Sequence, residues 1–515
     1  MSSILTNNSA MVALQTMKGI NSQMNATQQQ ISTGKSVANA KDNAAVWAIS
    51  KTMESDVKGF KGISDSLSLG SSTVSVARQA SEKVTELLTE IKGKAVAAQE
   101  QNQDRGKIQT DIKALREQIS SVVNGAQFNG LNLIKGTEDM NVLSSLDRNG
   151  TGEVTASQIT VARADLSTAT GTFGAGTALN ANATVSNTGT GALDNAGNSA
   201  VITMATGADY STGTASFTVA GTQFSFAAGE LGGAADNQDV AAANLSAKIN
   251  ALGISGVTAS ATGAAVTLSS ARAFEGVNVQ VNAVAGAAAT SSITAVNGAA
   301  PTGTNSSTNS TVAERSLNVE FSNAAAVKDG DSYRVSFAGE QFDYVAGRGE
   351  SFEDVTRGLK AAVDGRGMTG ITTAVAKDDS GNWQLKIDNS TTTARTLSAV
   401  GNAGGVASGG LFGLDGIDVT TTAGAKAGLE NIENMIEKSI DASAAFGSSE
   451  KRIDIQKDFV GMLSDALKSG IGSMVDADME SVSARLQALQ TQQQLSTQAL
   501  TIANQQPQNI LALFR

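Results

Sequence analysis

The sequence predicts an α+β multidomain fold. N- and C-terminal helices pair into a coiled-coil or helical-bundle core, and a β-rich outer region with two ββαββ modules is inserted between them. Three observations support this prediction. The composition changes near residue 140 and again near residue 428. Apolar residues recur at alternating steps of three and four near both ends, which is typical of helices that pack through one narrow face. Between these ends, short segments alternate apolar and polar residues between Gly and Asn turns, as strands do.

Three helices are predicted in the first 140 residues, each with one narrow apolar face. Gly34 follows the first of them and is expected to turn the chain, because Gly accepts a positive φ. The inward positions are Ala10, Ala13, Met17, Ile20, Met24, Thr27 and Ile31 in the first helix, Val76, Ala80, Val84, Leu87 and Ile91 in the second, and Ile108, Ile112, Leu115, Ile119 and Val122 in the third.

The C-terminal end shows the same pattern. Helices this polar, with so narrow an apolar face, are marginal in water because nucleation is costly and little surface is buried. We therefore expect both ends to need partners; an ordinary antiparallel bundle within a monomer is the alternative. The inward positions are Leu429, Ile432 and Ile436, then Ile453, Gln456, Val460, Leu463, Leu467, Gly470 and Met474, and finally Val475, Met479, Val482, Leu486, Leu489, Gln493, Ser496, Leu500 and Ala503.

An internal repeat marks the middle of the chain. The segment Phe217–Phe226 recurs 118 residues later as Val335–Tyr344. A predicted helix and two further strands follow each copy, which indicates two ββαββ modules. Gly276–Ala313 has no charged residue and is interpreted as an exposed linker. The helices are predicted at Asp239–Leu252 and Phe352–Val363, and the strands at Val257–Ala261, Ala265–Ser269, Ile371–Ala376 and Trp383–Ile387.

These patterns divide the chain into six predicted parts. They are inner core helices at 1–43 and 476–515, a helical bundle at 44–140 and 429–475, a β connector at 141–200, an outer module at 201–300, a linker at 301–315, and a second outer module at 316–428.

Composition argues against several functional classes. The net charge of −11 disfavours nucleic-acid binding, which needs clustered Lys and Arg. The chain has no His and no Cys, so the commonest metal ligands, the usual proton shuttle and a thiol nucleophile are missing. No apolar run approaches the roughly 18–20 residues that span a bilayer, and Met1–Met17 lacks the features of a signal peptide. We expect no catalytic residue, cofactor, metal or membrane partner.

One segment resembles a calcium-binding loop. Asp147–Gln158 places oxygen-bearing side chains at alternate positions and Gly152 at the sixth. Its twelfth residue is Gln158 rather than the bidentate Glu that such loops require. A turn that leads into a strand at Val154–Val161 is therefore the preferred interpretation.

Several motifs at the two ends resemble the signatures of bacterial flagellin, over roughly residues 1–140 and 429–515. Two positions depart from the family pattern. Gly472–Val475 stands where the family usually has Ser-Arg-Ile-Arg, and Asp42-Asn43 replaces a pair of Asp. The matching motifs are Ile4–Asn8, Ile31–Lys35, Ala40–Ala45 and Phe128–Leu131 at the N-terminal end, and Asp476–Met479 and Leu500–Leu511 at the C-terminal end.

The resemblance implies a secreted structural subunit that polymerises into the bacterial flagellar filament and serves swimming motility. Its implied partners are further copies of itself in a helical homopolymer, a flagellar export chaperone, and the hook-associated junction and cap proteins. The implied self-assembly core consists of Ala10, Ala13, Met17, Ile20, Met24, Ile31, Met479, Val482, Leu486, Leu489 and Leu500.

Two other functions remain open at this point. A hook–filament junction or cap protein would have similar terminal helices without polymerising indefinitely. A secreted adhesin or glycan-cleaving enzyme would use carboxylates of the outer modules, with Glu340, Asp343 and Glu350 as candidates.

The resemblance also suggests altered immune recognition. Many flagellins present an Arg and, four residues later, a Leu to an innate immune receptor, and the matching positions here are Glu90 and Lys94. The simpler interpretation is that these two residues form an ordinary helix pair four residues apart.

Overall fold

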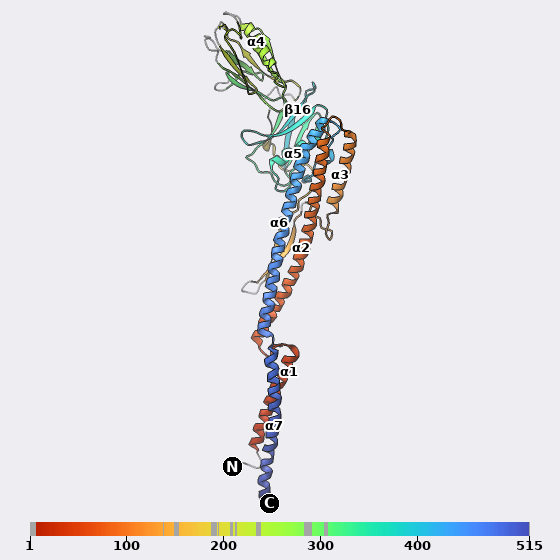
Figure 1. Cartoon of the computed structure of the whole chain (residues 1–515), viewed down its shortest axis with the longest axis vertical. Coiled ribbons are helices and arrows are strands. Elements are labelled where there is room, and N and C mark those ends of the chain that lie inside the picture. The colour runs from red at the N-terminus through yellow and green to blue at the C-terminus, as the bar shows by residue number, and fades with distance from the viewer. Residues whose placement is uncertain are drawn as a thin grey trace. The chain divides into compact units, whose positions relative to one another are not determined.

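The structure is a computed structural model that divides into two compact units. The first unit contains Met1–Ser75, Asp139–Val161 and Gly447–Arg515, and the second contains Val76–Glu138 and Ala162–Phe446. Two long helices, α2 (Ala44–Ala97) and α6 (Thr422–Val475), contribute residues to both units (Figure 1). The described residues are 7–136, 138–148, 154–186, 193, 195–206, 210–211, 214–232, 238–282, 291–302 and 307–513.

In the first unit, α1 (Asn8–Thr33) lies beside α7 (Met479–Leu513) (Figure 1). A hairpin of β1 (Met140–Arg148) and β2 (Val154–Val161) packs on α2. Glycine makes this approach possible, because a Cβ at Gly70 would lie 2.7 Å from a methyl carbon of Val142. The strand predicted at Val154–Val161 is confirmed. Residues 149–153 of the calcium-like segment lie outside the described residues.

In the second unit, α3 (Arg105–Gly125) packs with parts of α2 and α6 into a helical bundle. The predicted inward residues Ile91, Ile112 and Ile432 are fully buried in it. A hydroxyl pair joins α2 to α6, because Thr85 Oγ1 donates to Ser439 Oγ at 2.9 Å. This bundle carries the two β-rich modules of the unit.

Module 2 is formed by residues 183–186 and 317–402, and its strands are all antiparallel to their neighbours. One sheet has the order β15-β16-β12-β3 and the other β14-β13-β17. Phe321, Tyr333 and Phe352 form an aromatic group in its core. The elements are β3 (Ala183–Ser186), β12 (Leu317–Phe321), β13 (Ser332–Phe337), β14 (Glu340–Val345), α5 (Phe352–Asp364), β15 (Ile371–Lys377), β16 (Trp383–Asn389) and β17 (Ser398–Asn402), with short 3-10 helices at Asn180–Asn182 and Leu414–Gly416.

Module 1, residues 198–312, lies between β3 and β12 in the sequence. Its sheets have the orders β10-β4-β8-β7 and β11-β9-β5-β6, and their inner faces share one apolar core with a helix. The elements are β4 (Asn198–Thr203), β5 (Ala215–Val219), β6 (Thr222–Phe226), α4 (Gln238–Ala251), β7 (Val257–Thr262), β8 (Ala265–Ser270), β9 (Val277–Val281), β10 (Ser292–Val296) and β11 (Asn309–Val312).

The repeat seen in the sequence corresponds to the same hairpin in both modules. The turn residues Ala220 and Gly221 have φ of 50° and 77°, and Ala338 and Gly339 have 57° and 79°. Positive φ at both central residues is the type I′ turn that suits a two-residue hairpin. In each module the order hairpin, helix, hairpin is observed, and further strands complete the two sheets.

The predicted linker is wrong. Gly276–Ala313 contains β9, β10 and β11, and β11 lies inside the linker expected at 301–315. These strands pair within module 1, β9 with β5 and β11 with β9. The absence of charge reflects alternate burial of small apolar side chains along β9, rather than exposure. Module 1 also begins inside the connector expected at 141–200, because β4 starts at Asn198.

Candidate self-assembly interface

The predicted inward residues of α1 are the less exposed ones on that helix. Ile20 is buried, and Ala10, Ala13, Met17, Met24 and Ile31 are half-buried, while their neighbours on the other faces are exposed. On α7, Leu489 is buried and Val482, Leu486 and Leu500 are half-buried. The two helices contact each other, so the structure brings these ten residues of the proposed core together along one seam.

Met479 is the one residue of that set with a different environment, since 42% of it is exposed. It is the first residue of α7, directly after Asp478. The carboxylate of Asp478 accepts hydrogen bonds from the backbone N–H groups of Glu480 and Ser481 at 3.1 and 3.4 Å. Met479 therefore belongs to a helix start, where the alternating pattern alone does not predict the direction of a side chain.

Polar contacts set the register of the two helices. Gln493 Nε2 donates to Asn21 Oδ1 at 2.8 Å, and Asn7 Nδ2 donates to the carbonyl of Ala503 at 2.9 Å. Because each contact joins residues from opposite ends of the chain, a shift of one helix along the other would break both. A polar residue inside an otherwise apolar seam commonly specifies register in this way.

Backbone contacts join the ends of α1 and α6. Gly34 ends α1 in the left-handed conformation with φ of 68°, which confirms the turn predicted there. Its carbonyl accepts from the N–H of Ala477 at 2.9 Å, and the N–H of Ser36 donates to the carbonyl of Val475 at 2.7 Å. The chain thus leaves α1 and enters α7 at one shared point.

The two departures from the family motifs lie beside this point. Asp42 Oδ2 accepts from the N–H groups of Ala38 and Asn39 at 2.9 and 3.0 Å, and Asn43 Oδ1 caps the start of α2. At Gly472, a Cβ would lie 2.8 Å from Asp476 Oδ2. The substituted residues therefore fit local turn and cap geometry.

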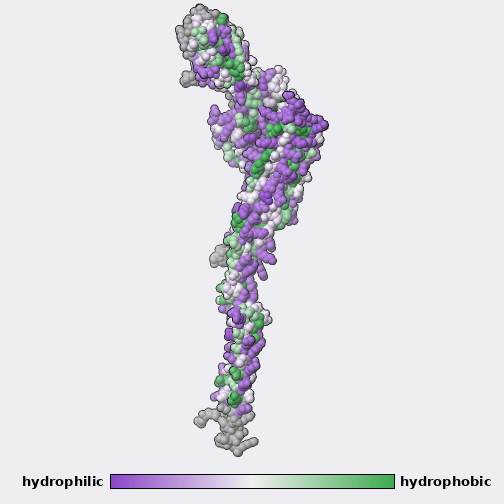
Figure 2. Space-filling view, viewed as in Figure 1, coloured by the Kyte–Doolittle hydropathy of each residue, from purple (hydrophilic) through white to green (hydrophobic). Residues whose placement is uncertain are grey.

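Sequence reasoning missed a second set of apolar residues, which the helices expose. Large apolar surfaces that face water commonly mark contact sites. The spacing of Ile455, Phe459 and Met462 could have indicated them, because these residues share one helix face. Figure 2 shows apolar residues between hydrophilic ones on the surface of the α1–α7 pair. The exposed fractions are 59% for Met11, 63% for Val12, 46% for Leu14, 58% for Leu495, 65% for Ile502, 58% for Ile455, 52% for Phe459 and 66% for Met462.

The candidate catalytic carboxylates of the outer region are separately paired with cations. Glu340 pairs with Arg366 at 2.7 Å, and Asp343 with Arg334 through two contacts at 2.6 and 2.7 Å. Both pairs are structural contacts of module 2. Glu350 forms a network of its own.

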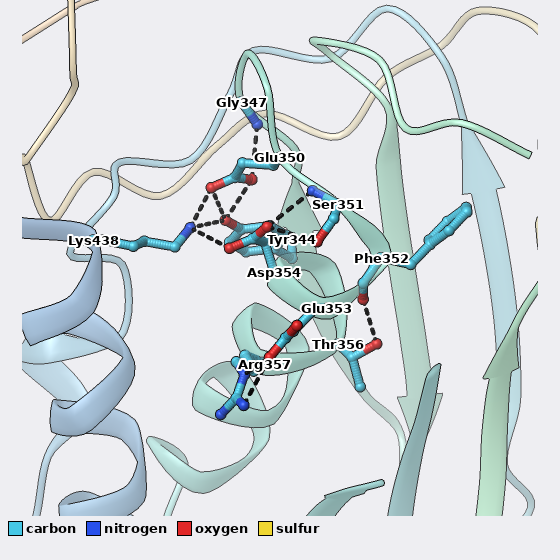
Figure 3. A network of polar contacts seen from close by, with 10 residues as sticks. All are labelled: Tyr344, Gly347, Glu350, Ser351, Phe352, Glu353, Asp354, Thr356, Arg357 and Lys438. Atoms are coloured by element: carbon cyan, nitrogen blue, oxygen red, sulfur yellow. Dashed lines mark hydrogen bonds and ion pairs between the residues drawn. The ribbon is translucent and has the colours of Figure 1, made fainter. Parts of the chain in front are cut away.

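Glu350 lies between β14 and α6 (Figure 3). Its carboxylate is paired with Lys438 of α6 and accepts from the hydroxyl of the fully buried Tyr344 at 2.8 and 2.9 Å. The N–H of Gly347 donates to it at 3.0 Å, and Lys438 also pairs with Asp354 at 3.5 Å. Burial, followed by the charge of Glu350, raises the pKa of Tyr344 well above its usual value. The network fastens module 2 to α6.

Lys94 does not pair with Glu90 as the simpler interpretation expected. Its ammonium contacts Asp111 Oδ2 of α3 at 2.6 Å. This hydrogen bond raises the pKa of Lys94, and Glu90 contributes a weaker electrostatic effect. The ion pair joins α2 to α3, whereas an i,i+4 pair would lie on α2 alone.

Known proteins are similar to this chain both at its two ends and along its whole length. Residues 4–139 match the family model of the bacterial flagellin N-terminal helical region, and residues 429–514 that of the C-terminal helical region. Flagellin A of Rhizobium meliloti is 31% identical over 522 residues, and flagellin D of that organism is 30% identical over 522 residues; both alignments cover 100% of each chain. A flagellin of Brucella melitensis is 41% identical over 167 residues, which is 32% of this chain and 59% of the relative.

A solved structure, FlgL of Xanthomonas campestris, matches with a TM-score of 0.29 and 12% identity over 82% of this chain and 99% of FlgL. Among the helices of the described residues, none has the length and apolar character needed to cross a membrane. The full-length relatives and the two terminal family matches are both consistent with a structure in which the N-terminal helix α1 packs against the C-terminal helix α7. The chain therefore belongs to the bacterial flagellin family, whose members are structural subunits, not enzymes, of the extracellular flagellar filament that serves motility.

Proposed function

We propose that this chain polymerises through the α1–α7 pair, with the seam between the two helices holding each pair together and the outward apolar residues contacting neighbouring copies. The observation that carries this proposal is the division of apolar residues on α1. Ile20 lies in the seam, whereas Met11 and Val12 are more than half exposed. Exposed apolar side chains that gather on one surface commonly mark a contact with another protein.

Burial of these residues supplies a driving force for assembly. Fully burying a Val, Leu, Ile or Met side chain contributes about 1.5–3 kcal/mol. Among the residues whose burial is described, the α1–α7 pair exposes six such side chains, so even partial burial against neighbours exceeds the contribution of any one exposed ion pair, which is about 0–1 kcal/mol. Head-to-tail contacts that do not close on themselves produce an open helical polymer.

According to this proposal, the subunit has three parts in the filament. Residues 1–43 and 476–515 form the inner core, 44–140 and 429–475 a surrounding helical bundle, and the two β modules the outer part. Before assembly, the subunit is kept unpolymerised by an export chaperone, and in the filament it meets hook-associated junction and cap proteins. The family resemblance supports these partners.

The sharpest test changes outward residues while keeping the seam. Val12→Ser with Ile502→Ser should raise the critical concentration for filament growth at least tenfold, measured by sedimentation and electron microscopy. Helix content by circular dichroism should stay unchanged, because neither side chain lies in the seam. Val240→Ser on module 1, 42% exposed, is the matched control and should not alter growth.

Deletion variants complete the test. Chains without 1–35 or without 476–515 should form no filaments from seeds. Ordinary filaments grown from either trimmed chain would refute the proposal. If the intact chain bound to seeds and stopped their growth, it would instead function as a junction or cap protein.

A further inference from the structure

Among the described strands, β6 lies at the edge of its sheet. It ends the order β11-β9-β5-β6 and pairs with β5 through a two-residue turn, with Val219 opposite Thr222. In such a hairpin alternate residues direct their backbone groups toward and away from the partner strand. The N–H and C=O groups of Gln223 and Ser225 therefore point away from the sheet, and they have no hydrogen-bond partner among the described residues.

The equivalent strand of module 2, β14, is protected at the corresponding positions. Glu340 stands where β6 has Thr222, and Asp343 stands where it has Ser225; both are held in ion pairs. Near the end of β14, the N–H of Val345 donates to Ser408 Oγ at 3.2 Å, and the N–H of Ser408 donates to the carbonyl of Val345 at 2.9 Å. Charged residues and covering segments are common means of preventing edge-to-edge pairing.

The nearby edge strand β7 is covered in another way. The side-chain amide of Asn250, on α4, accepts from the N–H of Ala259 at 2.8 Å and donates to its carbonyl at 2.8 Å. This amide satisfies the backbone of β7 as a neighbouring strand would. In module 2, α5 packs against β14 as well as β15 and β16, whereas the main strand contacts of α4 are with β7 and β8. Within the described part of module 1, neither protective device is found at β6.

We propose that β6 pairs in an antiparallel manner with β6 of a second copy of this chain. With Phe224 at the centre, Gln223 of each copy lies opposite Ser225 of the other, and the two pairs exchange four backbone hydrogen bonds. The edge is complementary to itself, because each outward residue offers one donor and one acceptor. Thr222–Phe226 has no charged residue, so the approach of two copies brings no like charges together.

A five-residue strand buries much less than the roughly 1,000 Å² expected of a stable interface. The contact is therefore weak between free subunits and becomes effective where a polymer holds copies at millimolar effective concentration. In this respect it rests on the proposed filament assembly. The two-fold pairing joins copies two by two, in addition to the head-to-tail contacts of the helical core.

Cysteine trapping tests the pairing in filaments of the full chain, which has no Cys of its own. Filaments grown from an equal mixture of Gln223→Cys and Ser225→Cys chains should give disulfide-linked dimers on mild oxidation. Either variant alone should give several-fold less. Equal yields in the mixture and in the single-variant filaments would overturn the register, and the absence of dimers from well-formed filaments would overturn the pairing.

A charge variant provides the second test. Thr222→Glu gives β6 the acidic residue that Glu340 provides at the equivalent position of β14.

 When both cysteine variants carry Thr222→Glu, the dimer yield of their mixture should fall at least tenfold. Thr258→Glu places the same charge at an exposed position of β7 and should leave the yield unchanged.

Filament growth separates this inference from the proposed function. The Thr222→Glu chains should still polymerise, since the change lies outside α1 and α7. Filaments that form with an undiminished dimer yield would overturn the pairing at β6. A failure of the unsubstituted chain to form filaments would instead count against the proposed function.

Discussion

Gln493 and Asn21 form a side-chain hydrogen bond of 2.8 Å between α7 and α1, inside a seam that is otherwise mostly apolar. Both residues are half-buried. We predict that Gln493→Ala and Asn21→Ala each weaken filament assembly and that their effects are not additive. The expected coupling is about 0.5–1.5 kcal/mol, the net contribution of an intramolecular hydrogen bond. A double-mutant cycle on the critical concentration measures it. Additive effects of the two substitutions would show that the bond does not contribute.

The apolar part of the seam should respond more strongly. Leu489 is 4% exposed, and Leu489→Ala should cost about 2–5 kcal/mol in the stability of the assembled helix pair. Thermal melting of filaments, followed by circular dichroism, measures this loss. Gln487→Ala, at an exposed position of the same helix, is the control and should melt like the unsubstituted chain.

Much of the fold could be predicted because local patterns determine it. Steps of three and four residues fixed the seam of α1 and α7, and the repeated Ala-Gly turns with their alternating flanks located the β5–β6 and β13–β14 hairpins. The partners of isolated strands could not be predicted in this way. β3 pairs with β12 although all of module 1 lies between them in the sequence, and no local pattern specifies that pairing.

Only the buried half of the candidate interface could be predicted from the sequence. An alternating pattern identifies the residues that share one buried face, such as Ile20 and Leu489. It does not identify outward residues such as Val12 and Ile502, because their exposure is known only when the packing of the helix is known. The Lys438 network was also missed, since it joins β14, the start of α5 and α6.

All three tyrosines of the chain should resist ionisation while it is folded. Tyr210, Tyr333 and Tyr344 are buried, and burial is the largest cause that raises the pKa of each phenol. An unfolded Tyr titrates near pH 10. A raised folded pKa means that this contribution to stability is present below about pH 10 and is lost as the pH rises above it. Absorbance at 295 nm should therefore show little phenolate at pH 10 in the folded chain and full ionisation after unfolding in urea. Normal titration of three tyrosines in the folded chain would contradict their burial.

Acid should weaken the attachment of module 2 to α6. Burial opposes ionisation of Asp354, but the charge of Lys438 and hydrogen bonds from Ser351 outweigh it and lower the pKa of Asp354. A lowered folded pKa contributes stability that is present above about pH 4 and is lost as the pH falls through the folded value. Proteolysis of the module should therefore accelerate below pH 4. Lys438→Met should accelerate it already at pH 7 and shift its pH dependence upward. Lys468→Met, a change in an exposed pair of α6, is the control.

The surface around Glu90 and Lys94 should be a poor ligand for the innate immune receptor that contacts an Arg and a Leu at these positions in many flagellins. A reversed charge and a lost apolar anchor at a binding hot spot each cost about 2 kcal/mol or more. The Lys94–Asp111 pair holds the lysine toward α3 and leaves no apolar side chain at that position. We predict that Glu90→Arg with Lys94→Leu raises signalling in receptor-reporter cells at least tenfold over the unsubstituted chain. Lys83→Leu with Glu86→Arg makes the same kinds of change at another exposed pair of α2 and should have no effect. Strong signalling by the unsubstituted chain would show that these two positions do not determine recognition.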